Sequence, residues 1–375
     1  MVIGLTEDMT TNPNVFFEPG LNRVEKYIIQ GVHMQMFCAN PDWMNEILIN
    51  DERLDDANEL YRLMYLIRQV QRKIESVYHL DEMKTPVHLC IGQEAIAAGV
   101  CHALSSSDYV FSNHRGHGHY LAKGGNLKKM IAELYCRTGG CALGRGGSMH
   151  LVDTAVGLMG ASSIVAGGIP LSVGAALTST LHSDQRISVA FFGDGAADEG
   201  VLYESINFAV LKKLPVLFIC ENNFYAVCSP ISNRQICETS IATRFSSMGL
   251  PSLRIDGTNV QQVYEIAVDA AKRAREGGGP TFIEAVAYRW CGHSGAGADT
   301  KLAYRSQAEL DSWMDICPLK RMKRALLVHS SNVDVVAKIE VCIDREIEEA
   351  FAHAFDTPLP GAEDVCATKC LYEGA

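Results

Sequence analysis

The chain of 375 residues has thirteen cysteines, but none are paired at the C-x-x-C spacing that is typical of zinc ribbons and thioredoxin-like redox sites. An odd number of cysteines in a chain of this size is typical of reduced thiols rather than of a disulfide framework. The chain has fewer basic than acidic residues: 33 Lys and Arg compared with 44 Asp and Glu, which gives a net charge of -11. This balance argues against nucleic acid and anionic membrane surfaces as partners.

Signals for export or membrane insertion are also lacking. The first ten residues, MVIGLTEDMT, have neither the basic segment nor the apolar core of a signal peptide, so we expect a cytoplasmic location. Residues 154–183 contain no Asp, Glu, Lys or Arg and are long enough to span a bilayer. Their many Gly, Ser and Thr residues, together with Pro170, instead favour a tight loop and a buried helix.

The remaining composition is that of a globular α/β protein. Hydrophobic residues make up 47% of the chain, which is large enough for one α/β core with appendages. Apolar residues at helical spacing over 57–77 predict an amphipathic helix, and strands then alternate with helices as far as 281–288. This order predicts a doubly wound parallel sheet flanked by helices. We expect an N-terminal arm over 1–55, the α/β domain over 56–330 and a C-terminal helical tail over 331–375.

Two apolar stretches that run into polar turns are the most informative feature of the chain. Residues 187–192 lead into Gly193-Asp194-Gly195, residues 215–219 lead into Glu221-Asn222-Asn223, and the segment between them has helical spacing. The pattern predicts a parallel βαβ unit with a right-handed crossover. In such sheets ligands bind outside the carboxyl ends of the strands, so we expect Asp194 and Asn223 to be neighbours in space.

The side chains of Asp194 and Asn223 limit the kinds of ligand that this site can bind. A carboxylate between two glycines would repel a phosphate unless a divalent cation lay between them. Carboxylate, amide and main-chain carbonyl oxygens are suitable ligands for Mg²⁺ or Ca²⁺. The residues therefore indicate a metal-bridged diphosphate site, and GDGAADEG does not fit the dinucleotide pattern G-x-G-x-x-G. The alternative is two ordinary turns without a ligand.

A GDG turn followed by NN resembles the thiamine diphosphate motif. The wider sequence resembles the α subunits of the heterotetrameric 2-oxo acid dehydrogenases (pyruvate or branched-chain) and acetoin dehydrogenases over roughly residues 56–310. The stretches that carry the resemblance, besides the metal motif, are HLCIGQEAIAAGV (88–100), YVFSNHRGHGHYLAKG (109–124), GGCALGRGGSMHL (139–151), SSIVAGGIPLSVGAAL (162–177) and YRWCGHS (288–294). The resemblance implies a thiamine diphosphate-binding fold with thiamine diphosphate and Mg²⁺ as cofactors.

The resemblance also implies roles for individual residues. The metal ligands would be Asp194, Asn223 and the carbonyl oxygen of Tyr225, and the catalytic side chains would be His293 and, less directly, His88. The residues that contact the cofactor would be His114, Arg115, Ser163, Val165, Gly193, Asp194, Gly195, Ala196, Asn223, Tyr225 and His293.

Each of these roles has a simpler alternative. Arg115 could form a surface ion pair, and residues 163–165 could serve core packing. His293 could be an ordinary histidine of a surface loop. The histidines of residues 112–119 look superficially like a metal-binding cluster, although the glycines and the arginine among them fit an anion-binding loop better.

The sequence departs from the family pattern in ways that leave the substrate open. His114 stands where many pyruvate dehydrogenases have tyrosine, and Cys291 replaces a histidine of those enzymes. The loop 294–303, which in the family closes over the active site, is longer than usual and lacks a Ser-Asp-Pro core.

The chain has no segment that could supply the activating glutamate of the family, and this predicts a partner subunit. In the family, the glutamate that activates the cofactor comes from a β subunit, and nothing in 375 residues resembles a second α/β domain that could supply it. We therefore expect an α₂β₂ assembly that decarboxylates a 2-oxo acid such as pyruvate, or cleaves acetoin, and passes the acyl unit to a lipoyl group on an acyltransferase. The alternatives are an acyloin-forming carboligase and a non-catalytic binding subunit.

Overall fold

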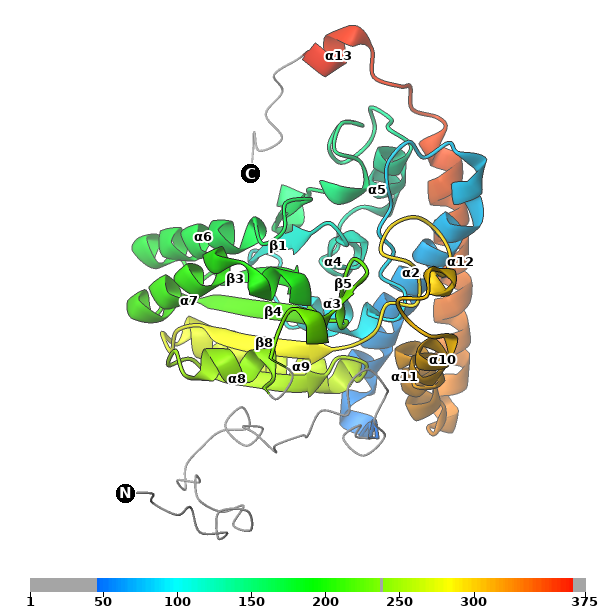
Figure 1. Ribbon diagram of the computed structural model, residues 1–375. Coiled ribbons are helices and arrows are strands. Elements are labelled where there is room, and N and C mark those ends of the chain that lie inside the picture. The colour runs from blue at the N-terminus through cyan, green and yellow to red at the C-terminus, as the bar shows by residue number, and fades with distance from the viewer. Residues whose placement is uncertain (1–45, 237–238, 367–375) are drawn as a thin grey trace, which may run out of the picture.

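A computed structural model describes residues 46–236 and 239–366, so most of the expected N-terminal arm lies outside the described residues. The described part is built on a six-stranded parallel sheet with the strand order β2-β1-β3-β4-β8-β7 (Figure 1). The strands are β1 (Tyr109–Asn113), β2 (Leu158–Ser162), β3 (Ser188–Gly193), β4 (Val216–Asn222), β7 (Ser252–Asp256) and β8 (Thr281–Val286). The order turns around at β1, which confirms the doubly wound sheet.

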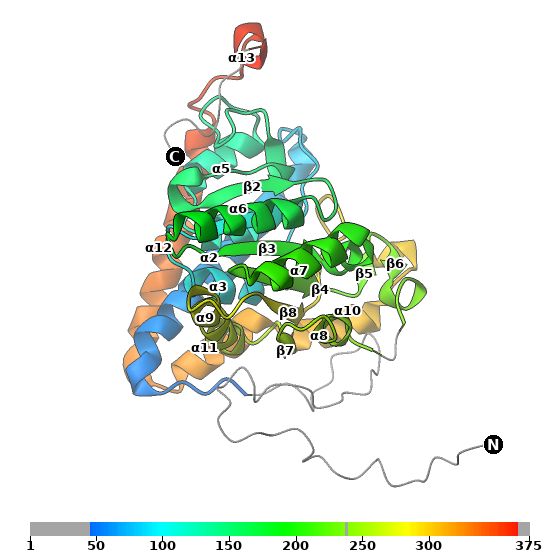
Figure 2. The ribbon, with the colours of Figure 1, turned by 90° about the vertical axis from the view of Figure 1, so that its left-hand side faces the viewer.

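Helices cover both faces of the sheet. α6 (Gly168–His182) contacts β1, β3 and α7 (Gly200–Lys212), and Figure 2 shows these two helices in front of the sheet. α9 (Val260–Arg275) packs on α3 (Glu94–His102) and on β4, β7 and β8. The other elements are α2 (Leu54–Val77), α4 (His117–Ala122), α5 (Leu127–Leu134), α8 (Ile241–Ser246), α10 (Gln307–Asp315), α11 (Pro318–Leu327), α12 (Val333–Ala354), α13 (Ala362–Cys366) and the two-stranded hairpin β5 (Tyr225–Ala226) and β6 (Ser229–Pro230).

The predicted βαβ unit is confirmed as β3, α7 and β4. β4 continues beyond its apolar stretch to Asn222, because Glu221 and Asn222 still pair in register with Ala285 and Val286 of β8. Asp194 follows directly after β3, and Asn223 follows directly after β4. The two turns therefore leave the sheet at the same edge.

Two long helices that lie far apart in the sequence pack side by side. α2 and α12 contact each other, and α2 confirms the amphipathic helix expected over 57–77 (Figure 1). Polar pairs join them, among them Tyr65 with Asp344 and the ion pair of Lys73 with Glu348. The periodicity gave no sign of the short helix α13 beyond them.

α6 corrects one prediction. The segment 154–183 does contain a loop and a helix, but the helix is buried on one face only, since Leu171 is 59% exposed and Leu181 is 76% exposed. The uncharged composition of residues 154–183 therefore did not indicate how much of α6 is buried. No described helix is both long enough and apolar enough to cross a membrane.

Glu133 in α5 organises the glycine-rich segment 139–151. Its fully buried carboxylate accepts hydrogen bonds from the backbone N–H groups of Ala142 (2.8 Å), Gly144 (2.9 Å), Gly146 (2.7 Å) and Gly147 (2.9 Å). A loop with so little apolar surface of its own therefore depends on one side chain for its shape.

We expect Glu133→Ala to lower the free energy of unfolding by about 3–5 kcal/mol, because up to four backbone donors lose their acceptor. Urea denaturation monitored by circular dichroism measures the loss. The control is Glu349→Ala on the exposed face of α12, which should stay within about 0.5 kcal/mol of the parent protein. A loss of similar size in both variants would contradict the role given to Glu133.

Candidate active site

A cavity of about 670 Å³, part of it open to solvent, lies at the carboxyl ends of β1, β3 and β4. This is where a doubly wound sheet binds its ligands. The predicted site residues that line the cavity are His114, Arg115, Val165, Gly193, Asp194, Gly195, Ala196, Asn223, Tyr225 and His293. Lining residues outside the predicted set are Gln93, Asn113, Ile164, Ala166, Phe192, Glu221, Ala226 and Val227.

Asp194 begins a short 3-10 helix, Asp194–Asp198, directly after β3. Its carboxylate is only 1% exposed, and Oδ2 forms an ion pair with Nη2 of Arg234. Burial raises the pKa of Asp194, while the charge of Arg234 acts in the opposite direction. Arg234 also forms an ion pair with Asp198. Sequence reasoning missed Arg234, which reaches this site from a short 3-10 turn after β6, Ile231–Asn233.

Asn223 and Tyr225 form the second turn of the site. Nδ2 of Asn223 donates to Oε1 of Gln93 at 2.8 Å, and Oδ1 accepts from the backbone N–H of Tyr225 at 3.3 Å. The hydroxyl of Tyr225 lies 3.0 Å from each carboxylate oxygen of Glu309. The side chain of Tyr225 is thus engaged by Glu309, and the resemblance assigns the metal role to its main-chain carbonyl and not to the hydroxyl.

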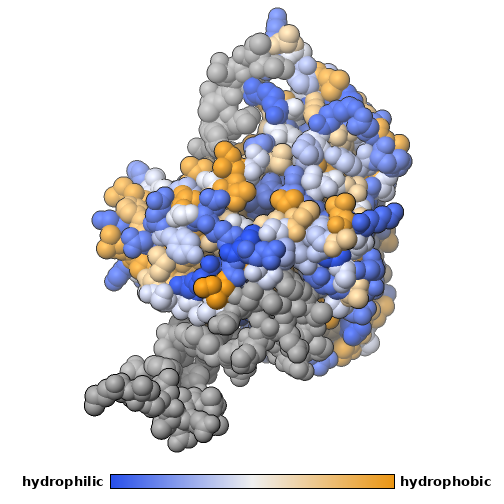
Figure 3. Space-filling view, in the orientation of Figure 1, coloured by the Kyte–Doolittle hydropathy of each residue, from blue (hydrophilic) through white to orange (hydrophobic). Residues whose placement is uncertain are grey.

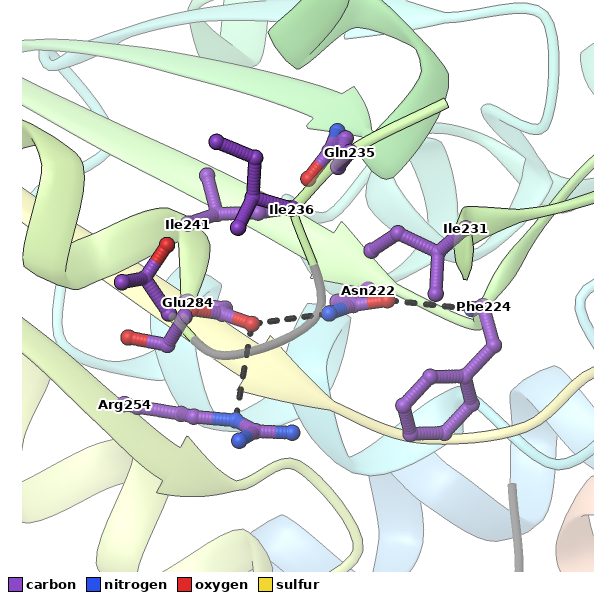
Figure 4. Close-up of a pocket in the computed structure, with 10 residues that line it drawn as sticks. Asn222, Phe224, Ile231, Gln235, Ile236, Ile241, Arg254 and Glu284 are labelled. Atoms are coloured by element: carbon purple, nitrogen blue, oxygen red, sulfur yellow. Dashed lines mark hydrogen bonds and ion pairs between the residues drawn. The ribbon is translucent and has the colours of Figure 1, made fainter. Parts of the chain in front are cut away.

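A buried carboxylate supports this turn from behind. Glu284 of β8 is 1% exposed, and its side chain accepts from Nδ2 of Asn222 (2.7 Å) and from the backbone N–H of Ala242 (2.9 Å). Figure 4 shows Asn222 between Glu284 and Phe224, whose backbone N–H donates to Oδ1 of Asn222 at 3.0 Å. Arg254 lies 3.5 Å from the same carboxylate. These contacts fix the backbone behind the Asn223–Tyr225 turn.

Arg115 carries a buried positive charge. Its guanidinium donates to the carbonyl oxygens of Leu89 (2.8 Å) and His293 (3.2 Å). Burial and the charge of Arg289 lower the pKa of Arg115 to about 10, so it remains a cation at neutral pH. Within 46–236 and 239–366 no carboxylate lies within ion-pair distance of it, so the alternative of a surface ion pair is wrong for the described chain.

Three histidine rings, two of which line the cavity, lie against one another. The ring centroids of His88 and His114 are 4.8 Å apart, those of His88 and His293 are 5.1 Å apart, and those of His114 and His293 are 5.4 Å apart. The backbone N–H of Gly295, two residues after His293, donates to the carbonyl oxygen of Val87 at 2.8 Å. This tie between the two segments holds His88 beside His293, although His88 itself does not line the cavity.

The surroundings keep all three imidazoles neutral. Burial, aided by the charge of Arg115, lowers the pKa of His88 to about 4 and the pKa values of His114 and His293 to about 3. Nδ1 of His88 lies 3.2 Å from the carbonyl oxygen of Pro86, which can only accept, so this ring carries its proton on Nδ1. Nδ1 of His293 faces Nη2 of Arg115, which can only donate, so this ring carries its proton on Nε2. His88 thus presents Nε2 as an acceptor, and His293 presents Nε2–H as a hydrogen-bond donor.

The remaining histidines of residues 112–119 have structural partners. His117 is fully buried, with Nε2 2.8 Å from the hydroxyl of Ser148. His119 contacts Ser112 through Nδ1 at 2.8 Å and Glu221 through Nε2 at 3.2 Å. A metal-binding cluster within this motif is therefore wrong, because His114 alone of its three histidines reaches the cavity.

Glu221 and Asn113 also line the cavity, although sequence reasoning gave them no role. Nδ2 of Asn113 donates to the carboxylate of Glu221 at 3.1 Å. Burial alone would raise the pKa of Glu221, but the charge of His119 and the hydrogen bonds from His119 and Asn113 lower it. Asn113 lies at the carboxyl end of β1, and Glu221 lies at the carboxyl end of β4. These positions were the signal in the sequence that could have identified the two residues.

Residues 163–165 are exposed, so they do not serve core packing, which was the alternative role for them. Ile164 is 71% exposed and Val165 is 52% exposed, and both lie at the rim of the cavity. The side chain of Ser163 does not line the cavity, since its hydroxyl lies 3.2 Å from Nε2 of His150.

The loop 294–303 is held by Asp299. Its carboxylate accepts from Nε of Arg305 at 2.7 Å and from Nη1 of Arg289 at 3.3 Å, and it also contacts the hydroxyl of Tyr304. Burial would raise the pKa of Asp299, but the hydrogen bond from Tyr304 and the charges of the two arginines lower it. The loop is thus anchored in its second half, while His293 stands just before it.

The sequence of this chain is similar to those of proteins whose family is known. The family model described as the dehydrogenase E1 component matches residues 61–363. The α subunit of acetoin:2,6-dichlorophenolindophenol oxidoreductase from Bacillus subtilis (strain 168) is 36% identical over 301 residues, which are 80% of this chain and 89% of that protein. The pyruvate dehydrogenase E1 component subunit α of Porphyra purpurea is 35% identical over 314 residues, which are 82% and 90% of the two chains. The chain belongs to the dehydrogenase E1 component family.

Proposed function

We propose that this chain is the α subunit of a thiamine diphosphate-dependent E1 dehydrogenase, which acts with a β subunit on a 2-oxo acid such as pyruvate, or on acetoin. The observation that carries the proposal is one cavity that joins Asp194, Asn223, Arg115 and His293 at the carboxyl edge of the sheet. The relatives are named as α subunits of acetoin and pyruvate enzymes.

The residues of the cavity fit a metal-bound diphosphate. Arg115 is a buried cation with no carboxylate within ion-pair distance among the described residues, and the more distant charge of Glu221 leaves room for an anionic ligand beside it. At Gly195 an added Cβ would lie 2.9 Å from Cβ of Ala226, so only glycine lets the two backbone segments come this close. Asp194 and Asn223 would hold Mg²⁺ through their side-chain oxygens, and Tyr225 would hold it through its carbonyl.

When bound, thiamine diphosphate would supply the electron sink for cleavage next to a carbonyl group. The chain would contribute binding, charge and proton positions around it. Arg115 would neutralise phosphate oxygens, while Ile164 and Val165 at the rim would shield the site from water. His88 could accept a hydrogen bond or a proton at Nε2, and His293, as a neutral ring, could donate a hydrogen bond from Nε2–H to a substrate oxygen.

We expect the activating glutamate to come from a β subunit in an α₂β₂ assembly and the acyl unit to pass to a lipoyl group on an acyltransferase. The described part of this chain forms a single α/β sheet of this kind, which leaves the glutamate to a partner.

Co-expression of the full chain with its β partner tests the proposal. The purified complex, supplied with thiamine diphosphate and Mg²⁺, should reduce an artificial dye acceptor with pyruvate or acetoin, and the α chain alone should not. Release of an acyloin without dye reduction would favour a carboligase. A complex that fails to bind thiamine diphosphate would contradict the assignment altogether.

A further inference from the structure

The amide of Gln93 lies in the wall of the cavity beside the metal turn, and the proposed function gives it no role. Gln93 precedes α3, is 2% exposed and lines the cavity together with Asp194 and Asn223. Its Oε1 accepts from Nδ2 of Asn223 at 2.8 Å, across 130 positions of sequence. One half of the amide is therefore committed to a residue of the metal turn.

The other half of the amide is unsatisfied. Nε2 of Gln93 is buried and has no hydrogen-bond partner among the described residues. Rotation of the amide by 180° would not help, because Nε2 would then face the donor group of Asn223. The next residue offers no partner either, since the carboxylate of Glu94 is bound by Arg68 and by the backbone N–H of Gly92. A buried donor without an acceptor destabilises the folded protein, so it indicates a group that arrives with a ligand.

The surroundings define the chemistry of that ligand. Nε2 can only donate, so it requires an acceptor atom. Arg115 in the same cavity has no described carboxylate partner, and Asp194 and Asn223 present oxygens suited to a hard cation. An anion with several oxygens, bound through a divalent cation, would satisfy all of these groups together.

We propose that Gln93 is a further ligand-binding residue of this site, which donates from Nε2 to an oxygen of the metal-bound diphosphate. Through Oε1 it also positions Asn223, because an Nδ2 engaged by Gln93 leaves Oδ1 as the atom that Asn223 presents to the metal. This inference rests on the proposed function and names the contact by which the site would recognise the diphosphate end of its cofactor.

The variant Gln93→Glu separates the two roles. Glutamate has the shape of glutamine and keeps an acceptor for Asn223, but it replaces the donor with a negative charge. We expect the Kd of the α–β complex for magnesium pyrophosphate, and for thiamine diphosphate with Mg²⁺, to rise about 10-fold or more. The Kd for Mn²⁺ alone, measured by electron paramagnetic resonance, should stay the same or fall, because the site gains negative charge. A merely structural role would weaken anion and cation binding together.

Two further variants complete the test. Gln93→Leu removes both hydrogen bonds, and we expect it to weaken pyrophosphate and Mn²⁺ binding together; it also serves if Gln93→Glu does not fold. Gln69→Glu on α2 adds the same charge away from the cavity and should change neither constant by more than about twofold. If the parent complex binds pyrophosphate and Gln93→Glu binds it equally well, or loses affinity for thiamine diphosphate alone, the inference is overturned. If the parent complex binds neither probe, the proposed function itself fails.

Discussion

Replacement of Asp194 by alanine should abolish metal-dependent binding of thiamine diphosphate, with a loss of affinity of roughly 100-fold or more. Asp194 is the only carboxylate among the three proposed metal ligands, and a buried carboxylate supplies most of the attraction for a divalent cation. Titration calorimetry of the α–β complex with thiamine diphosphate, with and without Mg²⁺, measures the effect.

Asp198 provides the matched control for this variant. It lies one 3-10 turn further on and shares the ion pair with Arg234, but it does not line the cavity. We expect Asp198→Ala to change the affinity by no more than about threefold. Full metal-dependent affinity in Asp194→Ala would show that the metal has been assigned to the wrong residue.

His293→Ala should leave cofactor binding nearly intact but reduce turnover by roughly 10²–10³-fold, the usual contribution of a hydrogen-bond donor that stabilises charge developing on the substrate. The ring packs against those of His88 and His114, and Arg115 would keep its hydrogen bond to the main-chain carbonyl of residue 293 in the variant. Steady-state kinetics with pyruvate and acetoin, alongside calorimetry for the cofactor, separate the two effects. His102→Ala, outside the cavity, serves as the control, and unchanged turnover in His293→Ala would remove this residue from the mechanism.

The low pKa of His293 adds a pH dependence with a definite sign. Its pKa is about 3 in the folded chain, well below the ordinary value of 6.5, so the unfolded chain binds the additional proton between these values. The contribution of His293 to stability is therefore present above pH 6.5 and is lost as the pH falls toward 3. Folded-state measurements between pH 6 and 8 should find the ring neutral, so the ratio of the parent and variant rates should not change across this range.

Sequence reasoning identified those parts of the site that a strand and its own turn create. Asp194 and Asn223 follow apolar strands, and the parallel crossover between those strands predicts that the two side chains meet. Arg115 and His293 could be found only through resemblance to a family. Their local sequence gives no indication that the guanidinium of Arg115 donates to the carbonyl oxygen of His293 across 178 positions.

Two of the residues that were missed share one physical cause. Gln93 and Arg234 reach the site through contacts between segments that only the strand order and the loop paths bring together. The burial of these residues and the partners they contact depend on how the chain packs, so the periodicity of the sequence does not predict them. The same cause explains the error at α6, because an uncharged helix can lie on a core or on a surface, and the packing of α7 and the sheet decides which. The division of the chain into arm, domain and tail stays a prediction.

The pairing of α2 with α12 has a consequence for how the chain folds during synthesis. Tyr61 and Tyr65 of α2 find their partners Glu340 and Asp344 279 positions later in the sequence. At synthesis rates of about 5–20 residues per second, the ribosome needs roughly 15–55 s to add that length of chain. Throughout that interval the face of α2 that α12 covers is open to solvent, even if the strands between them have already paired. The growing chain therefore carries an uncovered amphipathic helix near its start, which is a natural substrate for chaperones that bind apolar surface, until the last long helix arrives.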